Sequence, residues 1–337
     1  MTGGRGGGKP GKPKLAMYWG ASCGGCEIAL VNLHERILDV DAAFDFMFCP
    51  CLLDTKKKDV EALPDGAIAV TLFNGALRSS ENEEMARLLR RKSRLLIATG
   101  SCAVEGCIPG LANLRSREEL IEGVYLDSPT LDNPQGTLPV GSSLTPLGAL
   151  ELPSLLPRVK TLREVVPVDY LIPGCPPESH QLWNALEAVI LGELPAPGSF
   201  LGAGEGTVCR DCARTKEDKS IGRLYRNHEI EPVAGKCLLE QGMICLGVAT
   251  RGGCGAPCPD ANMPCSGCYG PPEGVADQGG AMIAALGSII DPGEHRGKGE
   301  KELALRLEEF LDQVPDYAGL LYKYTLPGSV LGGRVKR

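Results

Sequence analysis

Short apolar runs alternate with amphipathic segments between residues 15 and 194. Continuous apolar runs are typical of strands that are buried on both faces of a parallel sheet, and the segments between them have the apolar spacing of helices. The pattern predicts strands at residues 15–19, 44–48, 67–73, 95–99 and 168–172, and helices at residues 27–40, 81–91 and 178–191. We therefore expect an α/β domain built on a flavodoxin-like, doubly wound parallel sheet.

The alternation weakens in the middle of the chain and is lost after residue 194. Pro and Gly recur between residues 105 and 162, where residues 142–156 are predicted to form a loop or a short helix. A linker, PAPGSFLGAGEG, precedes eight cysteines that lie between Cys209 and Cys268. We do not expect this cysteine-rich segment to form an ordinary core, so metal ligation should supply its folding energy. Residues 300–311 predict a final amphipathic helix.

Composition narrows the class of protein. The chain has 337 residues and a formal net charge of −7, which argues against nucleic-acid binding because that requires a basic surface. We find no run of 18 apolar residues and no export signal, so we expect a cytoplasmic protein without a membrane span. The number of cysteines, fifteen, is odd, and the chain is too long for a small disulfide scaffold. Clustered thiols in a reducing compartment are more often metal ligands than disulfides, so we expect metal ligands.

The first group of cysteines follows three of the predicted strands. Cys23 and Cys26 come after the strand at 15–19, and Cys102 and Cys175 come after two later strands. Ligands bind at the carboxyl edge of an open α/β sheet, so these four thiols can converge on one site. Soft thiolates suit either zinc or an iron–sulfur cluster, and buried core cysteines are the simpler alternative.

The second group is the cysteine-rich segment itself, whose eight thiols are enough for two clusters or two zinc ions. Spacing permits several pairings of these cysteines into sets of four. One grouping is Cys209, Cys212, Cys237 and Cys245 as one set, with Cys254, Cys258, Cys265 and Cys268 as the other. The Cys–Pro step at Cys258 also occurs in the ligand runs of ferredoxins.

Several stretches make the chain similar to the small subunits of NiFe hydrogenases. The resemblance is greatest to the gamma (G) subunits of F420-non-reducing, methyl viologen-reducing hydrogenases. It is carried by WGASCGGCE, GSCAVEGCIPGLANLRSREELIE, IPGCPPES, CLLEQGMICLG and CGAPCPDANMPCSGCYGPP. These stretches are specific when taken together, and they cover most of the chain.

The resemblance implies three 4Fe-4S clusters on twelve cysteines. Cys23, Cys26, Cys102 and Cys175 would bind the proximal cluster, which faces a NiFe centre in a separate large subunit. Cys254, Cys258, Cys265 and Cys268 would bind the medial cluster, and Cys209, Cys212, Cys237 and Cys245 the distal one. No catalytic residue is expected in the chain itself, because its role would be to transfer electrons.

These expectations divide the chain into four parts. Residues 1–14 would be a disordered tail, and residues 15–195 the flavodoxin-like domain with the proximal cluster. Residues 196–295 would form an irregular iron–sulfur cluster-binding domain with two clusters, and residues 296–337 a C-terminal helix and tail.

Three cysteines and one carboxylate remain outside the clusters. We expect Cys49 and Cys51 to pack near the edge of the sheet. Cys107 stands where oxygen-tolerant relatives have an extra proximal cysteine, but those relatives need a second one where this chain has Gly25, so we expect an ordinary proximal cluster. Proton relay is one interpretation of Glu27, but we expect it to be a solvated or helix-capping carboxylate.

The resemblance also implies partners. The NiFe large subunit would cover the proximal edge, and a ferredoxin-like delta subunit would lead from the distal edge to heterodisulfide reductase and electron bifurcation. One alternative is a small subunit of an F420-reducing hydrogenase or of a complex I-like oxidoreductase. A second alternative, from another class, is a zinc-stabilised scaffold protein.

Overall fold

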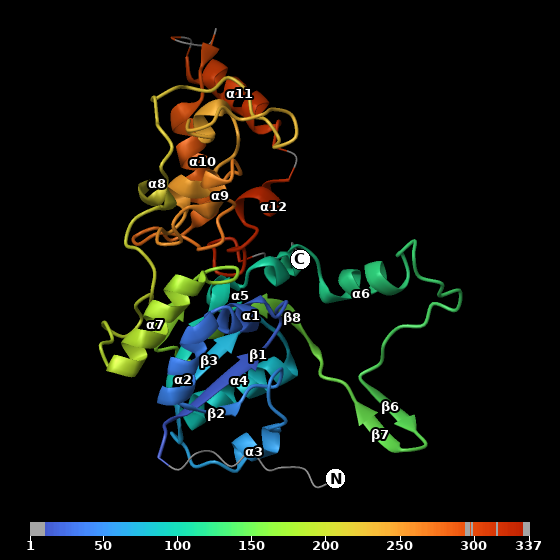
Figure 1. The fold of residues 1–337 in the computed structure, drawn as a ribbon. Coiled ribbons are helices and arrows are strands. Elements are labelled where there is room, and N and C mark those ends of the chain that lie inside the picture. The colour runs from blue at the N-terminus through green and yellow to red at the C-terminus, as the bar shows by residue number, and fades with distance from the viewer. Residues whose placement is uncertain (1–10, 294–296, 298, 315, 333–337) are drawn as a thin grey trace.

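A five-stranded parallel sheet forms the centre of the first half of the molecule. The computed structural model describes residues 11–293, 297, 299–314 and 316–332. The strands lie in the order β2-β1-β3-β5-β9, and every pairing within this sheet is parallel. Their bounds are β1 Lys14–Trp19, β2 Asp45–Phe48, β3 Ile68–Asn74, β5 Ser93–Thr99 and β9 Tyr170–Ile172. The predicted α/β parallel sheet is therefore confirmed (Figure 1).

Helices cover both faces of this sheet because its strands are apolar on both sides. On one face, α1 (Gly25–Val31), α2 (Ile37–Ala43) and α7 (Ser179–Leu191) pack on strand residues such as Leu72 and Ile97. On the other face, α3 (Lys57–Glu61), α4 (Ser80–Lys92) and α5 (Gly100–Glu105) pack on Phe73 and Leu96. The Ser79 hydroxyl caps α4, and Gly192 ends α7 in a left-handed conformation.

The predicted helix at residues 27–40 is interrupted. It is divided into α1, a 3-10 turn η1 (His34–Arg36), and α2. His34 has a φ of 55°, a value that ends an α-helix, so the periodicity continues across a break in the backbone. The helix at 300–311 is confirmed as α11 (Glu300–Leu311).

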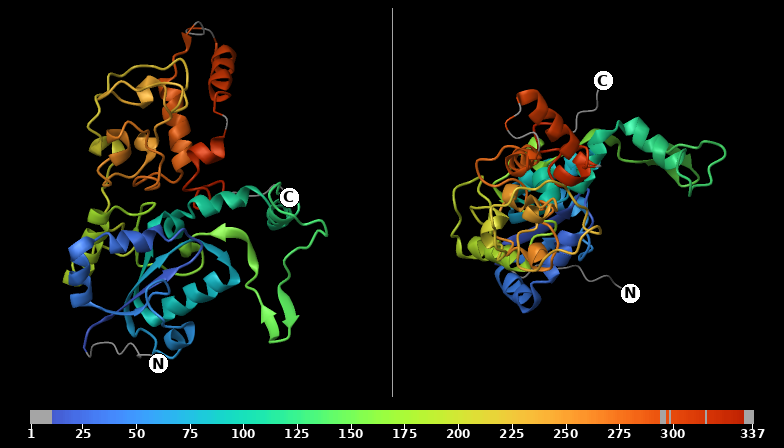
Figure 2. Two further views of the ribbon diagram at one scale, coloured as in Figure 1. Left: turned by 45° about the vertical axis from the view of Figure 1, so that its right-hand side comes forward. Right: turned by 90° about the horizontal axis from the view of Figure 1, so that it is seen from above.

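The expectation of a loop or short helix at residues 142–156 is wrong. After η2 (Ile108–Leu114) and α6 (Arg117–Tyr125), the chain forms an antiparallel hairpin of β6 (Ser142–Thr145) and β7 (Gly148–Glu151). It then returns as β8 (Leu155–Lys160), which pairs with the short strand β4 (Leu77–Ser79). Figures 1 and 2 show residues 115–154 extending away from the body as an arm.

The cysteine-rich segment has little regular structure, but it does contribute to a core. Its elements are α8 (Val208–Asp211), η4 (Leu239–Gln241), η5 (Leu246–Ala249) and α9 (Pro257–Asp260). The remaining 3-10 turn, η3 (Leu162–Glu164), lies earlier in the chain, between β8 and β9. Ile221, Leu224 and Leu246 pack with Met282 of α10 (Gln278–Ile289), Phe310 of α11 and Leu321 of α12 (Tyr317–Leu321). The expectation that this segment has no ordinary core is therefore wrong, because C-terminal helices complete one.

The predicted tails lie partly outside the described residues. Of the predicted disordered tail at 1–14, residues 1–10 lie outside the described residues, and Lys14 begins β1. Residues 294–296, 298, 315 and 333–337 also lie outside them. The four-part division of the chain remains a prediction. None of the helices in the described part of the chain combines the length and apolar character that crossing a membrane requires.

Candidate metal centres

The first group of cysteines comes together at the carboxyl edge of the sheet. Cys23 and Cys26 follow β1, Cys102 lies in α5 directly after β5, and Cys175 follows β9. Burial raises the pKa of the Cys26 thiol well above its ordinary value, and so do the nearby acidic groups of Cys102, Glu27, Cys175 and Cys23. Thiolates that repel one another in this way are stabilised by a cation between them.

Gly100 makes room for this group. It has a φ of +79°, and a Cβ atom at this position would lie under 3.0 Å from the Sγ of Cys26. Any other residue would therefore combine backbone strain with a steric clash against a thiol. Residue 100 must therefore be glycine if Cys26 and Cys102 are to face the same space.

Cys107 is a buried neighbour that the sequence did not assign to a site. Its Sγ lies 3.6 Å from the Sγ of Cys175, and its S–H lowers the pKa of Cys175 to about 7. Its backbone has a φ of 47°, which is unusual for a residue other than glycine. The spacing from Cys102 was the available signal, and Cys107 contacts the first set as a hydrogen-bond donor to Cys175.

Cys254, Cys258, Cys265 and Cys268 form a second neighbourhood around α9. Burial raises the pKa of Cys268 to about 12, and the charges of Cys254, Cys175 and Cys258 act in the same direction. Burial likewise raises the pKa of Cys265, with contributions from Cys245 and Cys268. The charged groups that act on Cys265 and Cys268 are therefore other cysteines, whereas Asp211 is the leading charged neighbour of Cys254.

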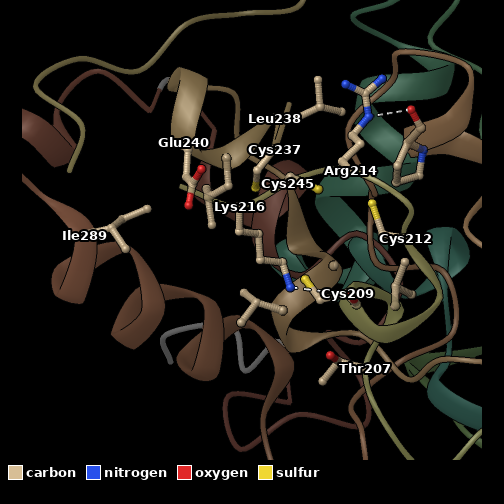
Figure 3. Close-up of a pocket in the computed structure, with 15 residues that line it drawn as sticks. Thr207, Cys209, Cys212, Arg214, Lys216, Cys237, Leu238, Glu240, Cys245 and Ile289 are labelled. Carbon is tan, nitrogen blue, oxygen red and sulfur yellow. Dashed lines mark hydrogen bonds between the residues drawn. The ribbon is translucent and has the colours of Figure 1, made fainter. Parts of the chain in front are cut away.

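Cys209, Cys212, Cys237 and Cys245 surround a cavity of about 310 Å³. Figure 3 shows the four side chains directed toward a common space from separate parts of the chain. Burial raises the pKa of Cys209 to about 11; Lys216 lowers it, and the three other cysteines of the set raise it. Gly247 lies against this set, because a Cβ there would be 3.5 Å from Cys209 Sγ and 3.7 Å from Cys245 Sγ.

The three sets lie one after another. Cys268 interacts with Cys175 of the first set through its charge and through the backbone. At the other side, the backbone N–H of Cys265 donates to Cys245 Sγ over 3.3 Å. The set around α9 is therefore in the middle, next to both of the others.

The sheet and the cysteine-rich segment are held together beside these sites. The Ser101 hydroxyl donates to the Cys268 carbonyl oxygen, and the backbone N–H of Gly174 donates to the Ser101 oxygen over 3.2 Å. The backbone N–H of Glu178 donates to the Tyr269 hydroxyl over 2.9 Å. These contacts hold the first and middle sets at a defined separation.

Glu27 differs from the sequence-based expectation. It is buried beside Cys26 and accepts a hydrogen bond from the Asn74 side chain, so it is not a solvated carboxylate. Glu27 Oε2 and Asn74 Oδ1 have no hydrogen-bond partner among the described residues. The charge of Glu27 raises the pKa of Cys26, so this buried carboxylate lies close to the first set.

The donor chemistry of the three sets fits iron–sulfur clusters. Each set supplies four thiols, which are soft ligands, and the last set encloses a cavity. Among the described residues, no three His, Cys, Asp or Glu side chains are placed to hold a single metal ion. Cys49 and Cys51 follow β2 with their sulfurs 3.4 Å from each other, and Cys49 packs in the same buried cluster as Cys26.

Relatives of known class share nearly the whole chain. The iron–sulfur G subunit of the F420-non-reducing hydrogenase from Archaeoglobus profundus is 38% identical over 96% of this chain and 98% of that protein. The corresponding G subunit from Methanothermobacter thermautotrophicus is 36% identical over 97% of this chain and 98% of that protein. The chain belongs to the G-subunit family of F420-non-reducing hydrogenases. As a member of that family it is a component of an oxidoreductase that acts with a NiFe large subunit, and the family carries iron–sulfur clusters.

Two further similarities accompany this membership. The family of the 20 kDa subunit of NADH ubiquinone oxidoreductase matches residues 23–189, which contain all four cysteines of the first set. A crystal structure of an NAD+-reducing NiFe-hydrogenase is similar over 55% of this chain and 94% of that chain, with 30% identity and a TM-score of 0.47.

Proposed function

We propose that this hydrogenase small subunit carries three 4Fe-4S clusters and transfers electrons between a NiFe site and a partner protein. The proximal cluster would be bound by Cys23, Cys26, Cys102 and Cys175. The medial cluster would be bound by Cys254, Cys258, Cys265 and Cys268, and the distal one by Cys209, Cys212, Cys237 and Cys245. The domain division at residues 195 and 295 is part of the same proposal.

The single observation that carries this proposal is the order of the three sets. Cys268 neighbours Cys175, and Cys265 neighbours Cys245, so the middle set connects the other two. A relay needs adjacent redox centres, and this arrangement would supply them in succession. When bound, the clusters would supply one-electron redox chemistry.

The residues of the chain would set position and polarity around the clusters. Gly100 admits Cys26 to the proximal site, and Ser101 holds the proximal and medial loops together. Cys107 donates to Cys175, and hydrogen bonds to cluster sulfurs tune their reduction potential. Lys216 lies at the wall of the distal site, where it lowers the pKa of Cys209.

The partners follow from this order. The NiFe large subunit would cover the proximal edge of the sheet, and an electron-transfer partner would dock where Lys216 borders the distal set. We propose a ferredoxin-like delta subunit that leads to heterodisulfide reductase and to electron bifurcation. We also propose a reducing compartment, the cytoplasm, because none of the fifteen cysteines among the described residues forms a disulfide.

Metal analysis of protein purified without oxygen tests the number of clusters. About twelve iron atoms and as many sulfides per chain are expected. Replacing one ligand of each set, with Cys102→Ala, Cys258→Ala and Cys237→Ala in turn, should remove a different electron paramagnetic resonance signal each time. Zinc without sulfide would refute the proposal in favour of a scaffold protein. Reduction of the three signals by H2 in the presence of the large subunit tests the transfer itself.

A further inference from the structure

The arm formed by residues 115–154 exposes apolar side chains along its whole length. None of residues 114–158 is buried. In the hairpin, Leu144 is 88% exposed and Leu147 is 95% exposed, while Leu150 and Leu152 are more than half exposed. A two-stranded hairpin is marginally stable in water when nothing packs on it, and contiguous exposed apolar surface marks an interaction site. The arm therefore lacks a partner surface within the described part of its own chain.

The base of the arm, in contrast, is held firmly. Asn113 is buried at the end of η2 and forms two hydrogen bonds with Val159 of β8, of 3.0 Å and 2.7 Å. The Arg78 guanidinium donates to the Leu156 carbonyl oxygen over 2.9 Å. Both roots of the arm are thus fastened to each other and to β4. The arm projects from a fixed base, as Figures 1 and 2 show.

This base belongs to the proximal site. Val159 packs in one buried cluster with Cys102 and Cys107, and Cys175 is packed against that cluster. Helix η2 begins directly after Cys107. A protein that covers the proximal cysteines would therefore lie close to the base of the arm.

We propose that the arm is a docking element that binds the surface of the NiFe large subunit. This proposal rests on the proposed function, because it requires the large subunit to cover the proximal edge. The large subunit is the expected partner of the arm because the base of the arm is continuous with the proximal edge that this subunit would cover. The facing surface of the large subunit should offer an apolar groove with basic residues beside it, since residues 116–155 contain six acidic side chains and one basic one.

A second copy of this chain is the competing occupant. The chain has a formal net charge of −7, and the arm adds to that acidity, so two copies would meet with like charges. Like charges oppose this pairing, whereas an apolar groove with a basic rim would accept the same arm.

The test compares two arm variants with a matched control. In the first variant, residues 141–152 are replaced by a short Gly-Ser linker, which can bridge the gap because the N–H of Leu152 donates to the Gly141 carbonyl over 2.9 Å. The second is Leu144→Asp/Leu147→Asp. The control is Leu38→Asp/Leu191→Asp, which changes exposed leucines on α2 and α7. Each small subunit is purified anaerobically with its clusters and titrated with the NiFe large subunit.

Both arm variants should keep the iron content of the wild type and lose affinity for the large subunit by about 100-fold, while the control binds like the wild type. Unchanged affinity in both arm variants would overturn the proposal and leave the proposed function intact. If arm variants change only a self-association seen by light scattering, the second copy is the occupant and the proposal is also wrong. A wild-type chain that carries clusters but binds no large subunit would instead refute the proposed function.

Discussion

A Cβ atom at Gly100 would lie under 3.0 Å from the Sγ of Cys26. One residue begins α5 and the other lies in α1, so this close approach joins two loops that leave different strands of the sheet. Because the φ of Gly100 is also positive, both the backbone and the available space require glycine here. The first set of cysteines therefore depends on a residue that carries no thiol.

Gly100→Ala should reduce the iron content by about four atoms per chain, because the added methyl group displaces a ligand thiol. Gly192→Ala is the matched control, since Gly192 has a φ of +72° and no atom close to where its Cβ would be. Alanine is strained by the positive φ at both positions, so the two variants differ in the clash with Cys26, which occurs only at residue 100. Iron and sulfide analysis, together with the proximal paramagnetic signal, measures the outcome. Equal iron loss in both variants would assign the effect to strain.

Cys107→Ala should leave the iron content unchanged and lower the midpoint potential of the proximal cluster. The Cys107 thiol donates to Cys175 over 3.6 Å. A hydrogen bond to a cluster sulfur stabilises the reduced cluster, which carries more negative charge, so its loss lowers the potential. A shift of up to roughly 60 mV corresponds to a hydrogen bond of about 0.5–1.5 kcal/mol. Cys49→Ala, which removes an equally buried thiol, is the control for a redox titration. Loss of iron in the Cys107 variant would instead show that this thiol is a ligand.

Glu105 should make the stability of the protein depend on pH. Burial raises its pKa to about 7 from 4.5, although Arg163 and Arg251 act in the opposite direction. The folded state binds this proton more tightly than the unfolded state, so the stabilisation is complete below pH 4.5 and is lost as the pH rises through about 7. The total change is about 3 kcal/mol.

Glu105→Gln should remove this dependence and stabilise the protein at neutral pH relative to the wild type. Anaerobic urea unfolding between about pH 5 and about pH 8 measures the difference in slope. Glu187→Gln, at an exposed position on α7, serves as the control. Parallel curves for the wild type and Glu105→Gln would contradict the prediction.

Asn113→Ala should destabilise the base of the arm by about 1–3 kcal/mol, because it leaves the buried N–H and C=O groups of Val159 without partners. Asn133→Ala is the matched control, since Asn133 makes a similar set of hydrogen bonds in an exposed part of the arm. Thermal unfolding and hydrogen exchange at the Val159 amide report the loss. Unchanged exchange at Val159 would show that Asn113 does not hold the base.

Much of the fold could be predicted because strand and helix periodicities are local. The apolar runs before Cys23, Cys102 and Cys175 correspond to β1, β5 and β9, and parallel strands place these cysteines at one edge. The hairpin at residues 142–151 was missed because its strands have no buried face, so their sequence shows no alternation of apolar and polar positions. The break at His34 was missed because periodicity does not record a single change of φ.

The sequence by itself determined the α/β class, the cysteines that could act as ligands, and a resemblance that the relatives bear out as membership of a hydrogenase subunit family. Only the tertiary structure decided which thiols are neighbours, that Cys107 contacts Cys175, and that Glu27 is buried against Asn74. It also decided that the arm has no partner surface among the described residues of its own chain. The reason is that ligand type and periodicity are properties of short segments, whereas contact and burial depend on residues far apart in the chain.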